Sequence, residues 1–215
     1  YAYINPHIMI ILHIFEHEWK DRQAQVKSFL QSAINKNQHK IGARKCKFIW
    51  SELKKDKQQV AQFLDDYHIQ GRVNCKYVIK ILYDNQLVGC ATFGRHHRNS
   101  TDWVLSRFCT KQNYTIQGGL AKISKLAYSK LQSPLISWAH YRLSDGNGYK
   151  KAGWIEEDLL PPDYFYHKGI KVISKQSRQK KLIGTPKELT EHEHALLDGL
   201  FRVYDCGKIR FRYTE

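Results

Sequence analysis

The sequence lacks any long apolar run. Its longest, residues 8–14, is interrupted by His13 and is far shorter than the roughly 20 residues that a membrane-spanning helix needs. No basic segment precedes this run and no small-residue cleavage site follows it, which argues against a signal peptide. The first residue is Tyr1 rather than Met, as in a trimmed piece of a longer protein. We expect no membrane association and a cytoplasmic location.

The sequence has few cysteines, and their spacing matches no disulfide or metal-binding motif. There are five, an odd number, and no two of them form a Cys-x-x-Cys motif. This usage argues against a disulfide-stapled scaffold and against a cysteine zinc site. It favours a reducing, intracellular compartment, and we predict no metal site.

Acidic residues are also scarce. The 215 residues include 20 Asp and Glu against 35 Lys and Arg, a net charge of +15. This excess indicates a polyanionic partner, with nucleic acid ahead of an anionic membrane, and a merely basic surface is the plainer alternative. At 42% hydrophobic and 13% aromatic residues the chain can still bury a core, which excludes a disordered basic tail.

Hydrophobic periodicity predicts an α/β fold. Residues 8–14 read as a strand and residues 16–35 as a helix, and a basic linker without acids follows at 36–47. We therefore expect an N-terminal piece, residues 1–38, and a main domain, residues 39–215. The main domain should contain strands at 76–83, 87–93, 103–109 and 135–140, helices at 57–66, 120–131 and 146–152, a hairpin at 163–173, a basic helix start at 175–182, a helix from a capping box at Thr185 to about 197, and a final hairpin at 202–213.

A glycine pair separates the third strand from the next helix. Gly118 and Gly119 leave bare backbone N–H groups at a helix N-terminus, which is a cradle for a phosphate or pyrophosphate. A plain turn explains the same pair. Two features that follow in the sequence favour the phosphate-binding interpretation. They are the predicted strand at 135–140 and the segment Asn147-Gly-Tyr149-Lys-Lys-Ala-Gly153-Trp154.

This order resembles the cofactor-binding half of the GNAT acyltransferase fold. The resemblance implies a mixed, mostly antiparallel sheet flanked by helices, with an N-terminal strand–helix appendage, and a coenzyme A derivative as possible cofactor. The phosphate loop would be Gln117, Gly118, Gly119 and Ala121, although the family's loop is longer. Tyr149 would be the general acid, in a cleft beside the strand that carries Arg107.

An ordered set of short motifs resembles one branch of this fold, the GNAT-like C-terminal region of phage homing-endonuclease-like proteins, related to the Mom type of DNA-modification protein. The motifs span residues 40–213: His68-Ile-Gln-Gly, Thr92-Phe-Gly-Arg, Leu105-Ser-Arg-Phe-Cys, Gly118-Gly119, Asn147-x-Tyr149, Pro161-Pro-Asp-Tyr-Phe-Tyr, Ser177-Arg-Gln-Lys and Tyr204-Asp-Cys-Gly. The resemblance implies a DNA partner and a phage-infected bacterial host.

The N-terminal piece resembles the last strand and helix of a Vsr-like or PD-(D/E)XK nuclease domain. Residues 1–15 contain no acid, so a metal-binding nuclease centre is not complete in this chain. Glu16 and Glu18 could be a metal remnant, but two acids at a helix start are more typical of charges that complement the helix dipole.

Basic residues gather after an aromatic triplet. Cations that neutralise phosphates beside rings that stack on bases are typical of nucleic-acid surfaces, although a hairpin with inward aromatics and solvated lysines would look the same. The candidate nucleic-acid residues are Arg95, His96, Arg98, Tyr164, Tyr166, Lys175, Arg178, Lys180 and Lys181.

Three functions therefore stay open. The first is a phage-type, GNAT-like DNA-binding protein. The second is a transferase, either a Mom-like DNA base-modifying enzyme or an acyltransferase. The third is a structural or interaction protein in a larger assembly that contains nucleic acid.

Overall fold

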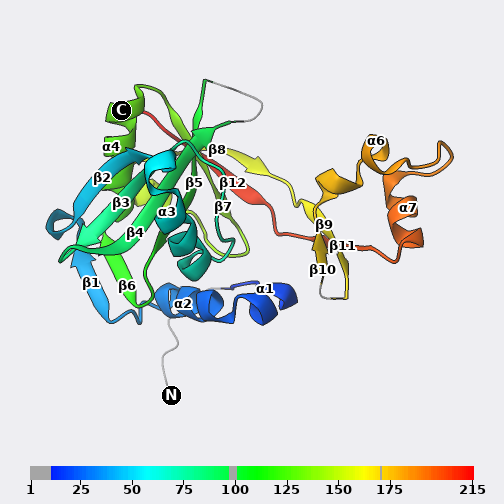
Figure 1. Cartoon of the computed structure of the whole chain (residues 1–215), viewed down its shortest axis with the longest axis horizontal. Coiled ribbons are helices and arrows are strands. Elements are labelled where there is room, and N and C mark those ends of the chain that lie inside the picture. Colours follow the sequence, from blue (N-terminus) through cyan, green and yellow to red (C-terminus); the bar gives the residue numbers. More distant parts are fainter. Residues whose placement is uncertain (1–10, 97–100, 170) are drawn as a thin grey trace, which may run out of the picture.

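The computed structural model describes residues 11–96, 101–169 and 171–215. A seven-stranded mixed sheet with helices on both faces forms the main body, and a three-stranded sheet stands beside it (Figure 1). This confirms the predicted α/β class with a mixed sheet flanked by helices. No helix in the described part of the chain is long and apolar enough to cross a membrane.

The large sheet has the strand order β2-β3-β4-β5-β7-β12-β8. Its strands are β2 (Lys47–Glu52), β3 (Tyr77–Tyr83), β4 (Gln86–Arg95), β5 (Trp103–Thr110), β7 (Leu135–His140), β12 (Lys208–Tyr213) and β8 (Ile155–Leu160). Every neighbouring pair is antiparallel except β5 and β7. The strands predicted at 76–83, 87–93, 103–109 and 135–140 are confirmed.

Two smaller sheets complete the strands. β1 (His39–Gly42) pairs in parallel with β6 (Tyr114–Gln117). The three-stranded sheet, called the small sheet below, has β9 (Tyr164–Lys168) between β10 (Lys171–Ile173) and β11 (Phe201–Tyr204). The helices are α1 (Glu16–Asp21), α2 (Gln23–Ala33), α3 (Leu53–Tyr67), α4 (Gly119–Leu131), α5 (Asn147–Lys151), α6 (Lys180–Ile183) and α7 (Glu191–Leu197), with 3-10 turns at Ala43–Lys45 and Lys175–Arg178.

Side chains point alternately to the two faces of a β-strand, so the large sheet has buried side chains on both faces. Val78 of β3 packs against Val60 and Leu64 of α3 on one face. The next residue, Ile79, belongs to the larger cluster on the other face, which includes Ile123 of α4. All of these side chains are at most 1% exposed.

Three predictions about the N-terminal region are corrected by the structure. Residues 11–14, the described part of the predicted first strand, lie in no strand. The predicted helix at 16–35 is broken at Arg22, whose φ of −136° is not helical. Residues 39–47 of the basic linker are ordered as β1, a 3-10 turn and the start of β2, because β1 pairs with β6.

The C-terminal predictions are corrected in two places. The capping box forms at Thr190, whose side chain accepts from the Glu193 N–H, so α7 begins at Glu191 and not after Thr185. The predicted final hairpin does not form: β11 pairs with β9, whereas β12 enters the large sheet between β7 and β8. The alternation of β12, which buries Ile209 and Phe211, explains this placement.

Candidate functional site

The large sheet opens between β5 and β7. The two strands pair only at Trp103–Leu135 and Val104–Ile136, near the start of each strand. Beyond these pairs lies a cleft of about 440 Å³. It is lined by the rest of β5 and β7, by residues 67–70, by Leu120, by Gly148 and Tyr149 of α5, and by one side of α2.

Tyr149 lies on the lining of this cleft. Its ring stacks on Phe211 with centroids 4.8 Å apart and meets Trp154 edge-on. Its hydroxyl is 2.8 Å from Oγ of Ser137, which in turn donates to the Leu105 carbonyl over 3.0 Å. The serine has a single hydroxyl proton, so Tyr149 is the donor in their bond. Burial raises the pKa of Tyr149, which keeps the phenol protonated near neutral pH.

Arg107 brings a positive charge to the same cleft. Its Nε donates to the Gly71 carbonyl over 3.3 Å and its Nη1 to the Ser106 carbonyl over 2.8 Å. In the described part of the chain, no carboxylate forms an ion pair with it. A guanidinium held by carbonyls alone can interact with a negative charge that enters or develops in the cleft.

Two histidines on the cleft wall are neutral. Burial, followed by the charges of Arg107 and Arg22, lowers the pKa of His68 from 6.5 to about 3. Burial, followed by the charges of Lys208 and Arg142, lowers the pKa of His140 to about 4. Sequence reasoning missed this pair because the two residues come from different elements, and only the fold brings both to the cleft.

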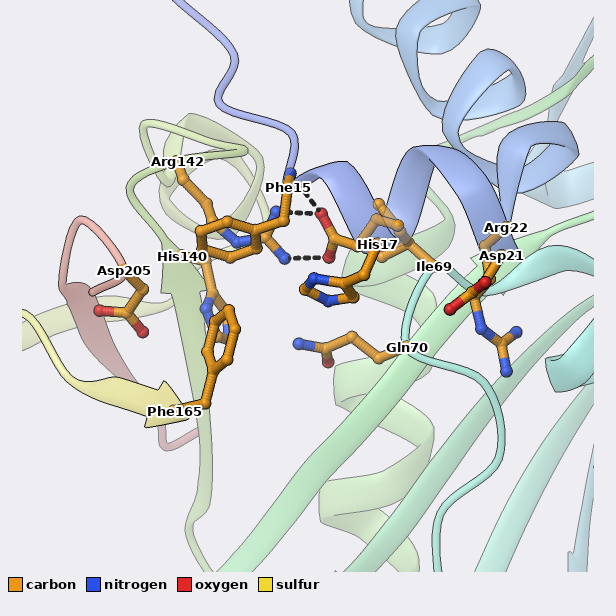
Figure 2. A pocket seen from close by; sticks show the side chains of 11 residues that line it. Phe15, His17, Asp21, Arg22, Ile69, Gln70, His140, Arg142, Phe165 and Asp205 are labelled. Carbon is orange, nitrogen blue, oxygen red and sulfur yellow. Dashed lines mark hydrogen bonds and ion pairs between the residues drawn. The ribbon is translucent and has the colours of Figure 1, made fainter. Parts of the chain in front are cut away.

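A second hollow of about 320 Å³ adjoins the cleft and shares His140, Ile69 and Gln70 with it (Figure 2). The rings of Phe15 and Phe165 line its other side. We call it the ring-lined hollow.

A buried ion pair fixes one wall of the ring-lined hollow. Arg142 donates to the two carboxylate oxygens of Glu18 over 2.8 and 2.5 Å, as the dashed lines in Figure 2 mark. Both residues are at most 6% exposed, and the guanidinium lies 4.6 Å over the Phe15 ring. Such a pair tolerates the loss of neither partner, because the other charge would stay buried. It ties α1 to the segment after β7.

The residues predicted to hold a cofactor begin α4. Gln117 ends β6, and Gly118 is the helix N-cap with a φ of 74°. No side chain caps this helix, and a Cβ at Gly118 would come no closer than 3.9 Å to Ala43. At Gly119 a Cβ would lie 3.0 Å from the Ile116 side chain, so packing explains that glycine. Of the first turn, Leu120 lines the cleft, whereas Gln117, Gly118, Gly119 and Ala121 do not.

Two of the predicted nucleic-acid residues, Arg95 and His96, pack on tryptophans. The Arg95 guanidinium lies 4.0 Å over the Trp103 ring and donates to the Thr101 carbonyl. The His96 ring is 5.9 Å from that of Trp138. Arg98 lies outside the described residues.

The predicted residues of the basic tail divide into buried, paired and exposed groups. Tyr166 is 1% exposed, so its ring has no free face for a base, and Tyr164 is half-buried with Arg202 4.3 Å over its ring. Lys175 pairs with Asp163, and Arg178 pairs with Asp198.

The exposed group of the tail is Lys180 and Lys181 in α6. In the part of the chain that the structure describes, neither side-chain ammonium forms an ion pair with a carboxylate, whereas the Lys180 backbone N–H donates to the Glu191 carboxylate over 2.9 Å. The ion pairs of Lys175 and Arg178 therefore leave Lys180 and Lys181 as the predicted tail cations, among the described residues, whose side chains are not engaged by a carboxylate.

Comparisons with known proteins concern structure alone. No protein-family model and no curated protein matches the sequence. A GNAT family acetyltransferase from Elizabethkingia anophelis with acetyl-CoA bound is 12% identical at a TM-score of 0.47, covering 80% of this chain and 99% of that chain. An acyl-CoA N-acyltransferase from Pseudomonas aeruginosa is 11% identical at a TM-score of 0.43, covering 79% and 99%. A Bacillus subtilis acetyltransferase in complex with CoA is 10% identical at 0.43, covering 80% and 99%.

Proposed function

We propose that this chain is a GNAT-type transferase that moves an acyl-type group within the cleft between β5 and β7, with nucleic acid as its acceptor. The observation that carries the transfer is the protonated phenol of Tyr149, held in the opening of the sheet by Ser137 and Phe211. A phenol that stays protonated near neutral pH and lines a cleft of about 440 Å³ is typical of an acid catalyst.

The start of α4 fits an anionic carrier such as coenzyme A. Its first N–H groups have no side-chain cap, and the open surroundings of Gly118 leave the backbone accessible to an oxygen of a phosphate. Gln117, Gly118, Gly119 and Ala121 would hold the phosphates. Such a carrier, when bound, would supply the group to be transferred as a thioester.

The chain's own residues then have separate roles. Tyr149 holds at Oη the proton that a leaving thiolate needs, and Ser137 orients that hydroxyl through its own bond to Leu105. Arg107 stabilises negative charge that develops in the cleft. His140 is neutral near pH 7 and lies where the cleft meets the ring-lined hollow, through which an acceptor can enter.

The test combines binding and turnover. We expect coenzyme A and acetyl-CoA to raise the melting temperature of the chain, and free thiol to be released from acetyl-CoA in the presence of DNA. Tyr149→Phe should keep the thermal shift and lower thiol release by about 100-fold, the usual scale for a lost general acid. Tyr141→Phe, at a tyrosine that is 41% exposed, is the matched control and should change neither. Absence of any shift with either compound would overturn the proposal.

A second candidate is a GNAT-like, phage-type DNA-binding protein that performs no transfer. The net charge of +15 and the exposed Lys180 and Lys181 favour it. Lys180→Glu with Lys181→Glu should weaken DNA binding for every sequence tested, because phosphate contacts do not read bases. Lys125→Glu with Lys130→Glu, the same charge change on exposed positions of α4, is the control. Equal losses in both double variants, or binding that does not respond to salt, would count against this candidate.

A further inference from the structure

The small sheet has one face that its own helix does not cover. The strand register places Val172, His167 and Phe201 in one row across the three strands. Phe165 and Val203 form the next row on the same face, since side chains alternate along a strand. The opposite face forms a small core in which Tyr166 packs with Ala195 of α7 and with Leu200.

The first of these rows is open to solvent. Val172 is 41% exposed and Phe201 is 57% exposed. The His167 ring lies 6.1 Å from that of Phe201 and is only half-buried. Two neighbouring rings are therefore presented at the surface rather than packed in a core.

The second row continues towards the cleft. Phe165 meets the rings of Phe15 and His17 edge-on, at centroid distances of 5.1 and 5.4 Å. These three rings line a hollow of about 160 Å³ together with His167 and Val172. They also line the ring-lined hollow of Figure 2, which reaches His140 at the cleft. A series of rings thus extends from the open row to the proposed reaction site.

The cations of the small sheet lie at its edge and on the other face. By the same alternation Lys168 and Lys171 lie opposite the open row, and Lys168 Nζ donates to the Asp198 carbonyl over 2.9 Å. Lys171 is exposed on β10, an edge strand. Among the described residues that line the 160 Å³ hollow, Glu16 is the one acid, and Lys20 pairs with it over 2.5 Å. Exposed rings on a chain with a net charge of +15 suit a partner that has both flat apolar faces and phosphates.

We infer that this face of the small sheet binds single-stranded nucleic acid, with bases stacked on Phe201 and His167 and the strand leading along the ring series towards the cleft. Unpaired bases offer their flat faces to rings, whereas a duplex hides them in its stack. The inference rests on the proposed nucleic-acid partner but not on the proposed transfer.

The test uses the full chain and a fluorescein-labelled oligothymidylate of about ten nucleotides, a length within the range that such surfaces bind. Phe201→Ala should weaken binding about tenfold, the scale of one lost stacking contact. His167→Ala should act in the same direction. Leu197→Ala is the matched control, because this α7 residue is 74% exposed and does not belong to the open row. It should leave the affinity unchanged.

Three outcomes would overturn the inference: no effect of Phe201→Ala, equal effects of Phe201→Ala and Leu197→Ala, or tighter binding of duplex DNA of equal length. The thermal shift with coenzyme A, measured on the same variants, separates this inference from the proposed transfer. Oligonucleotide binding through Phe201 without any such shift would support the surface and contradict the transferase. A thermal shift with coenzyme A, together with unchanged oligonucleotide binding in Phe201→Ala, would support the transferase and contradict the proposed nucleic-acid surface.

Discussion

At the scale of single residues, the two neutral histidines of the cleft link stability to pH. The pKa of His68 is lowered to about 3 and that of His140 to about 4 by burial, so both rings stay neutral where an unfolded histidine, with a pKa near 6.5, takes up a proton. The unfolded chain therefore binds more protons than the folded chain below about pH 6.5.

Stability should accordingly be fully present above about pH 6.5 and decrease as the pH falls towards about 4 for His140 and about 3 for His68. Each histidine contributes a slope of up to about 1.4 kcal/mol per pH unit. Urea unfolding at a series of pH values measures this slope. His140→Asn should flatten it, and His39→Gln, at an exposed position, is the control. An unchanged slope in His140→Asn would show that the ring takes up its proton equally in both states.

The chemistry of Tyr149 could be anticipated from sequence better than its surroundings could. The motif around it and the glycine at 153 indicated a tyrosine at the start of a short helix, and the structure places it on the cleft wall. Its hydrogen-bond partner Ser137 lies on β7, and its stacking partner Phe211 lies on β12. Neither carries a local sequence signal, because such contacts depend on sheet order and register.

At the scale of elements, α5 shows how a glycine can determine the position of a side chain. Gly146 is the N-cap of α5 with a φ of 78°, and a Cβ there would lie 2.5 Å from the Phe211 ring. Because Phe211 stacks on Tyr149, a displacement of this ring would reach the proposed acid. The positions of α5 and of the Tyr149 side chain thus depend on the absence of a methyl group at Gly146.

Gly146→Ala should therefore destabilise the fold by about 1–3 kcal/mol, the cost of a strained backbone, and should also lower turnover. Gly148→Ala is the matched control within the same helix, because a Cβ there meets no atom within 4 Å. It should stabilise the fold by about 0.5–1 kcal/mol, as alanine does inside helices. Chemical denaturation of both variants measures the difference. A shift of both midpoints in the same direction would contradict this account of Gly146.

Helices and strands with a strong local sequence pattern could be predicted. The start of a helix or the pairing of a strand could not be predicted where it depends on contacts with residues far along the chain. Both Thr185 and Thr190 are followed by Glu three residues later, so sequence alone offers two capping boxes. The structure uses Thr190, while the hydroxyl of Thr185 bonds to His194 instead. In the same way β11 and β12 are adjacent in sequence but belong to different sheets. Pairing partners far along the chain decide this, and local patterns do not record them.

At the scale of the whole molecule, the cationic side chains fall into two groups, those that form ion pairs within the fold and those that are exposed to solvent. Several cations are held by carboxylates within the fold, such as Arg210 and Arg212, both of which pair with Asp102 and Glu157. Others, such as Lys180 and Lys181, are exposed. The net charge therefore overstates what one surface can offer to a polyanion, and variants at exposed lysines are more informative than ionic strength alone.

The two main sheets should also differ in stability. Among the described residues, the core of the small sheet contains three buried residues, Tyr166, Ala195 and Leu200. The main cluster of the large sheet extends over β3, β4, β5, α4 and β12. Figure 1 shows the small sheet beside the main body, reached by the segments that lead from β8 and to β12. Fewer buried apolar contacts mean a lower free energy of local opening.

Native-state hydrogen exchange should therefore release the amides of β9, β10 and β11 at a lower opening free energy than those of β4 and β5. Tyr166→Ala, which empties the small core, should speed exchange in the small sheet and leave the large sheet protected. Phe93→Ala, at a residue that is fully buried in the large sheet, should lower protection there by about 3–5 kcal/mol. If Tyr166→Ala exposed both sheets equally, they would unfold as one cooperative unit, and the contacts of Phe165 with Phe15 and His17 would have to couple them.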